Sequence, residues 1–96
     1  MNDYIFLMHN DAPDIRSDDW GPYLAKLQQT GQFDGGSAIG SGECFSKLGA
    51  ARSTTAHLGG YIRVRAESLD DAKRFLEGNP VYEAGGTVEI RELPRT

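Results

Sequence analysis

The sequence predicts an α+β fold, a β-α-β-β-α-β sandwich in which an antiparallel four-stranded sheet carries two helices on one face. Residues 4–8 form an apolar run that is long enough for a strand and too short for a helix. Two stretches with apolar residues at helical spacing, near residues 20 and 69, each lie between strand-like segments. Right-handed crossovers then place both helices on the same side of one sheet, in a single domain over residues 1–96.

Composition excludes several classes of function. The 96 residues carry a net charge of −4, whereas nucleic-acid-binding proteins usually show a basic excess. No apolar run approaches the roughly 20 residues that a membrane span needs. The single cysteine, Cys44, cannot form an intrachain disulfide, and we expect a reducing, cytoplasmic location. The expected protein therefore binds neither nucleic acid nor membrane.

The first strand is expected from about Asp3 to His9, and both of its faces are apolar. Successive side chains of a strand point to opposite faces of the sheet, so Ile5 and Leu7 share one face and a second set of apolar side chains shares the other. That second set comprises Tyr4, Phe6 and Met8. Both faces of this strand therefore need to be covered.

The first helix is expected to begin near Asp18 or Asp19, either of which can cap its amino end. Gly31 suits the position just past its carboxyl end. One apolar stripe at i, i+3, i+4 and i+7 comprises Trp20, Tyr23, Leu24 and Leu27. A short strand over about residues 33–39 and a long, glycine-rich loop to about residue 55 follow.

The second half repeats the pattern. In the third strand, residues 61–66, Ile62 and Val64 share one face, whereas Tyr61, Arg63 and Arg65 share the other. A capping-box-like start at Ser68 opens the second helix, which ends at Gly78. The expected stripe of this helix comprises Leu69, Ala72, Phe75 and Leu76. The last strand covers residues 87–91, with Val88 and Ile90 pointing inward and Glu89 and Arg91 outward.

The two predicted helices cover one face of the sheet and leave the apolar side chains of the other face bare. An exposed apolar patch of several hundred Å² usually marks an interface. We therefore expect a homodimer, with two-fold symmetry, in which two copies pack these faces together. The alternative is that the long loop, residues 40–57, folds across the face of its own sheet.

Two segments carry a family resemblance: residues 58–61, which read Leu-Gly-Gly-Tyr, and residues 85–91, which read Gly-Gly-Thr-Val-Glu-Ile-Arg. With the strand at residues 4–8 and the tryptophan-bearing first helix, they resemble the YCII-related family, in particular its DGPF branch. The resemblance implies a dimeric α+β barrel of ferredoxin-like topology. The Asp-Gly-Pro-Phe tetrapeptide of that branch is absent here. The histidine and aspartate that suggest a catalytic pair in the YCII branch are also missing, since the helix has no histidine and Asn79 precedes Pro80.

The candidate catalytic residues are His9, which ends the first strand, and His57, which precedes the third. Either histidine can act as a general base near neutral pH, but the pattern favours the simpler interpretation that both are polar residues without a chemical role. The candidate ligand-binding residues are Tyr61, Arg63 and Tyr82. Arg63 can bind a carboxylate through two parallel hydrogen bonds, or can pair with Glu89 or with an acid of a second copy.

The residue pattern gives no metal-binding motif, and we expect neither a metal nor another cofactor. The favoured function is that of a small-ligand-binding homodimer with a pocket between sheet and helices. A lyase or isomerase that acts on a small acidic organic substrate through a histidine base is the second hypothesis. A regulatory protein-interaction module is the third.

Overall fold

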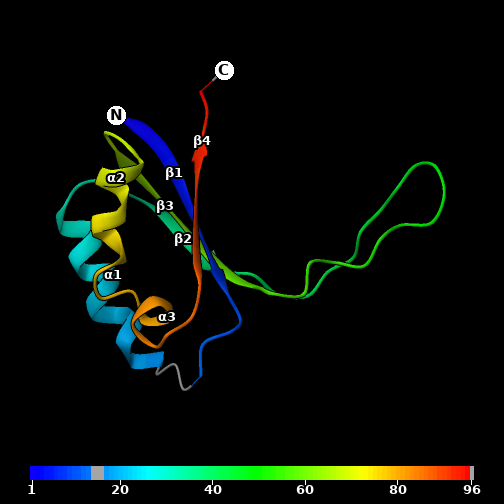
Figure 1. The fold of residues 1–96 in the computed structure, drawn as a ribbon, viewed down its shortest axis with the longest axis horizontal. Helices are drawn as coiled ribbons and strands as arrows, with labels where there is room; N and C mark the ends of the chain where they lie inside the picture. The colour runs from blue at the N-terminus through cyan, green and yellow to red at the C-terminus, as the bar shows by residue number, and fades with distance from the viewer. Residues whose placement is uncertain (14–16, 96) are drawn as a thin grey trace.

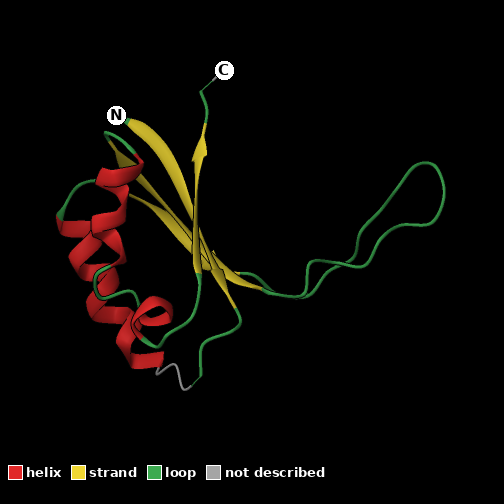
Figure 2. Ribbon diagram, viewed as in Figure 1, coloured by secondary structure: helices red, strands yellow, loops and turns green. Residues whose placement is uncertain are grey.

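The computed structural model describes residues 1–13 and 17–95, and it has the predicted order of strands and helices. Figure 2 shows the helices gathered on one side of the sheet. The four strands lie in the order β2-β3-β1-β4, and all neighbouring pairs are antiparallel. The elements are β1 (Asn2–His9), a 3-10 turn (Ser17–Asp19), α1 (Trp20–Gln29), β2 (Phe33–Ala38), β3 (Leu58–Ala66), α2 (Leu69–Ala72), a second 3-10 turn (Lys73–Leu76), α3 (Pro80–Glu83) and β4 (Val88–Leu93).

Strand β1 lies in the middle of the sheet and divides its side chains between two environments. Tyr4, Phe6 and Met8 are buried against the helices, whereas Ile5 and Leu7 are only half-buried on the opposite side. The side-chain alternation predicted for this strand is therefore confirmed. The buried core comprises Tyr4, Phe6, Met8, Tyr23, Leu27, Ile62, Val64, Ala66, Ala72, Phe75 and Val81.

The side of the sheet opposite the helices, called the open face below, mixes apolar and charged residues. On this face Ile5 lies between Arg63 of β3 and Arg91 of β4, its direct cross-strand partners. One step along, Leu7 lies between Tyr61 and Glu89. Figure 1 shows that the helices leave this face uncovered.

Helix α1 has the predicted apolar stripe: Tyr23 and Leu27 are buried, and Trp20 and Leu24 pack against the core. Asp19 occupies the N-cap position, but its side chain forms no capping hydrogen bond. None of the helices in the described part of the chain has the length and apolar character that a membrane crossing requires.

The second helical segment differs from the expectation. Only residues 69–72 are α-helical; the chain then tightens into a 3-10 turn. Leu69 was predicted to lie on the core stripe of this helix. It instead begins α2, and its side chain is 48% exposed to solvent. Ser68 does cap this helix, since its hydroxyl accepts a hydrogen bond from the backbone N–H of Asp71 at 3.1 Å.

Residues 40–56, called the arm below, project away from the sheet on the side opposite the helices (Figure 1). All of these residues are exposed, and the last backbone hydrogen bond at the base of the arm joins the Ile39 N–H to the Gly59 carbonyl at 3.0 Å. The alternative that this loop covers the open face of its own sheet is therefore wrong.

Candidate functional site

A cavity of about 390 Å³ lies between α1 and the ends of β1, β2 and β3. Its volume falls within the range of small-molecule pockets, which are about 300–1,000 Å³. Large apolar side chains dominate the lining: Met8, Trp20, Leu24, Phe33, Ile62 and Val81. The polar residues His9, Asn10 and Ser37 line the same cavity. This lining suits a flat, mainly apolar molecule with polar groups at one edge.

Glycines keep the strands close together beside the cavity. A Cβ added at Gly36 would lie 2.3 Å from the carbonyl oxygen of Tyr61, so only glycine allows β2 to approach β3 here. A Cβ at Gly60 would lie 3.2 Å from the Ser37 carbonyl oxygen and 3.6 Å from the methyl group of Met8. A side chain at residue 60 would therefore press against the backbone of β2.

His9 ends β1 at an irregularity in the pairing with β3, where the register shifts between Met8 and His9. Its Nε2 lies 3.1 Å from Oε1 of Glu89 on β4. Hydrogen bonds from Arg91 and then from His9 hold the pKa of the Glu89 carboxyl below its usual value. An ionised carboxylate only accepts hydrogen bonds, so Nε2 of His9 is the donor in this contact. This geometry is that of a histidine base oriented by a carboxylate.

His57 lies beside this pair, although 48 residues separate it from His9 along the chain. The two imidazole rings pack edge to face, with centroids 4.7 Å apart. The backbone N–H of Asn10 also donates to the His57 carbonyl at 2.7 Å, which fixes the two strand ends together. The structure thus brings both candidate histidines to one rim. Over residues 1–13 and 17–95, no group of three or more potential metal-ligating side chains is present.

The three candidate ligand-binding residues do not share this rim. Tyr61 lines the cavity with His9. Arg63 is exposed on the open face, two residues further along β3, and is not among the lining residues. Tyr82 lies on α3, is 47% exposed and also lies outside the lining. Only Tyr61 is therefore among the lining residues, and its side chain lies beside Leu7 on the open face.

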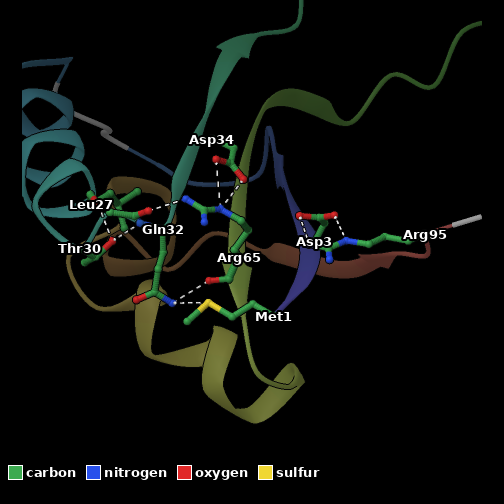
Figure 3. A network of polar contacts seen from close by, with 9 residues as sticks. Met1, Asp3, Leu27, Thr30, Gln32, Asp34, Arg65 and Arg95 are labelled. Carbon is green, nitrogen blue, oxygen red and sulfur yellow. Dashed lines mark hydrogen bonds and ion pairs between the residues drawn. The ribbon is translucent and has the colours of Figure 1, made fainter.

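The other charged pairs of the sheet stabilise its far end. Arg65 donates from Nε to both carboxylate oxygens of Asp34, at 3.3 and 3.0 Å, and also donates to the Gly31 carbonyl (Figure 3). Arg95 donates to Asp3 at 2.9 Å and lowers the pKa of that carboxyl. Arg65 thus pairs with an acid of the neighbouring β2.

Tyr23 and Asn79 occupy the segments in which the YCII resemblance would place a catalytic pair, and here both are buried. The Tyr23 hydroxyl donates to the Phe75 carbonyl at 2.7 Å. The Asn79 side-chain oxygen accepts from the N–H groups of Val81 and Tyr82, both at 3.1 Å, and so caps α3. No described residue accepts a hydrogen bond from the Asn79 amide nitrogen. These two residues stabilise the fold and offer no general base.

Sequence reasoning missed Glu89 as the partner of His9, and it missed Trp20 and Phe33 as cavity residues. Glu89 was correctly predicted to point away from the core. The 80 residues that separate it from His9 hide the contact, which depends on the register between β1 and β4. Trp20 and Phe33 carry the same apolar signal as any core residue, so periodicity cannot distinguish a cavity wall from packed interior.

Comparisons with known proteins agree with this architecture. A solved structure of 5-chloro-2-hydroxyhydroquinone dehydrochlorinase (TftG) from Burkholderia phenoliruptrix AC1100, in complex with 2,5-dihydroxybenzoquinone, is similar to this chain with a TM-score of 0.60. The two sequences are 22% identical, and the match covers 100% of this chain and 96% of that one. No curated protein matches the sequence significantly. The model of the YCII-related domain matches residues 9–95, so the chain belongs to the YCII-related family.

Proposed function

We propose that this protein binds a small, flat, mainly apolar molecule with polar substituents in the cavity between α1 and the sheet. The observation that carries this proposal is the composition of the cavity, which is lined mainly by aromatic and aliphatic residues together with the polar residues His9, Asn10 and Ser37. A few convergent polar groups in an apolar pocket are typical of small-molecule sites. The similar fold of a protein solved with 2,5-dihydroxybenzoquinone supports a ligand of this kind.

A filled-cavity variant tests the proposal. We expect hydroxylated quinones such as 2,5-dihydroxybenzoquinone to raise the melting temperature of the wild-type protein. Leu24 lines the cavity, so the larger side chain of Leu24→Trp should fill it and abolish this rise. Leu69→Trp is the matched control, because it makes the same change at an exposed helical residue outside the lining. Equal ligand-induced shifts in the wild-type protein and in Leu24→Trp would refute the assignment.

The functional unit that we propose is a cytoplasmic homodimer of the DGPF branch, packed through the open face. Half-buried Ile5 and Leu7 lack cover from the helices or from the arm, and burial stabilises apolar surface by about 25 cal/mol per Å². Ile5→Arg would set three arginines side by side across the sheet, since Arg63 and Arg91 already flank this residue. We expect wild-type protein to sediment as a dimer and this variant as a monomer.

The second candidate is an enzyme of the lyase or isomerase type that acts on a small acidic organic molecule. The observation in its favour is the hydrogen bond between Glu89 and His9, which is one of the residues that line the cavity. His9 Nδ1 would take a proton from a carbon next to a carbonyl group, and the electron pair of the broken C–H bond would move to the carbonyl oxygen as an enolate. Positioned proton transfer of this kind typically contributes 10²–10⁴-fold to a rate.

Deuterium exchange in D2O, followed by NMR over a panel of small hydroxylated keto acids and quinones, tests this candidate. His9→Ala should abolish exchange, and Glu89→Gln should lower its rate and change its pH profile. Asp34→Asn is the matched control, since Asp34 pairs with Arg65 at the far end of the sheet. Exchange that persists unchanged in both His9→Ala and His57→Ala would exclude a histidine base.

A further inference from the structure

The arm, residues 40–56, carries two large apolar side chains that are almost fully exposed to solvent. Phe45 is 88% exposed and Leu48 is 85% exposed, the highest values among the large hydrophobic residues described. The recorded hydrogen bond within the arm joins the Ser46 hydroxyl to the Leu48 carbonyl at 3.0 Å. In the described part of the chain, no hydrogen bond or ion pair links residues 40–56 to the sheet or to the helices.

The direction of the arm identifies what can cover it. The helices lie on one side of the sheet, and the arm projects on the other, beyond the open face (Figures 1 and 2). A second copy that packs on the open face would occupy the space alongside the arm. The arm also carries one more basic than acidic residue, through Lys47, Arg52 and Glu43, whereas the whole chain has a net charge of −4. The electrostatic balance therefore also favours contact between the arm and the acidic body of another copy.

We infer that the arm clasps the second copy of the homodimer and buries Phe45 and Leu48 against it. This inference rests on the homodimer proposed above and goes beyond it, because a sheet-to-sheet dimer does not by itself require the arm. The base of the arm adjoins the cavity, which Ala38 and Gly59 line. Contact between the arm and the partner subunit therefore also fixes the position of this edge of the cavity.

The first test is the oligomeric state of Phe45→Ser/Leu48→Ser, measured by sedimentation over a range of concentrations. Each dimer would lose the burial of two large apolar side chains from each arm, so its dissociation constant should rise by at least about 100-fold. The matched control is Thr54→Ser/Thr55→Ser, which changes two exposed arm residues and should leave dissociation unchanged.

The second test uses wild-type protein and does not depend on the folding of a variant. Cys44 is the single cysteine, is exposed and adjoins Phe45, so a maleimide-linked benzophenone labels the arm specifically. Irradiation of a mixture of ¹⁵N-labelled and unlabelled protein should give cross-linked peptides that combine the two isotopes.

The outcomes separate the two proposals. A dimer that the double variant leaves intact, with cross-links only within single chains, would overturn the arm inference and leave the homodimer standing. A wild-type protein that stays monomeric at high micromolar concentration would overturn both. Mixed-isotope cross-links together with weakened association of the double variant would establish the clasp.

Discussion

The hydroxyl group of Tyr23 should make this protein lose stability at alkaline pH. Its side chain is only 4% exposed, and the hydroxyl donates to the Phe75 carbonyl at 2.7 Å. Burial raises the pKa of Tyr23 from 10.0 to about 12, an effect that the neighbouring Asn79 partly opposes. The folded state therefore holds this proton more tightly than the unfolded chain does.

The sign and size of the effect follow from linkage. Because the folded pKa is raised, the stabilisation is fully present below pH 10 and is lost as the pH rises through 12. A difference of two pKa units corresponds to about 2.7 kcal/mol of unfolding free energy in total. About 1.4 kcal/mol of this should be lost by pH 11, and about 2.3 kcal/mol by pH 12.

Urea unfolding of wild-type protein and Tyr23→Phe at pH 7, 9, 11 and 12 measures this loss. At pH 7 the variant should be less stable by about 1–3 kcal/mol, because the Phe75 carbonyl is left buried without its partner. Above pH 10 the wild-type protein should lose stability faster, and the gap should close or reverse. Tyr82→Phe is the control, because Tyr82 is 47% exposed and its removal should leave the alkaline profile unchanged. Parallel profiles for wild-type protein and Tyr23→Phe between pH 9 and 12 would refute the reasoning.

Three further predictions concern stability and are measured by urea or thermal unfolding. Gly36→Ala should destabilise the protein by about 1–3 kcal/mol through overpacking, because the added Cβ would meet the Tyr61 carbonyl oxygen. Gly40→Ala is the control and should have no such effect, because residue 40 is surrounded by open space. Equal losses of stability in the two variants would contradict the close approach of β2 to β3. Asn79→Ala should cost about 1–2 kcal/mol by removing the cap of α3, and Asn79→Ser should recover part of it. Phe6→Ala, at a fully buried position in the central strand, should cost about 3–5 kcal/mol, and a loss below 1 kcal/mol would show that this position is not in a packed core.

The strands and their faces could be predicted from the sequence because they depend on local alternation. Tyr4, Phe6 and Met8 lie on the helix side of β1, as their spacing requires, and Ile62 and Val64 do the same on β3. The stripe of α1 was predicted for the same reason. The second helix was predicted less well. Its apolar periodicity predicted that Leu69 faces the core, whereas this residue of the first turn is exposed to solvent.

The candidate site could be predicted only in part. His9 and His57 stood out individually, because each lies at the end of an expected strand and a histidine can act as a general base near neutral pH. Their edge-to-face contact and the Glu89 carboxylate at 3.1 Å could not be predicted, since both depend on pairing between residues far apart in the chain. Arg63 also stood out, but the strand carries it to the open face and away from the cavity.

The sequence by itself determined the order of strands and helices and the side to which each strand turns its apolar residues. These properties follow from periods of two and about 3.6 residues, which any stretch of chain carries within itself. Only the tertiary structure decided that His9 meets Glu89, that a cavity lies beside Trp20, and that the arm extends beyond the open face. Each of these depends on strand register and on the path of a loop, which non-local packing sets and local periodicity does not encode.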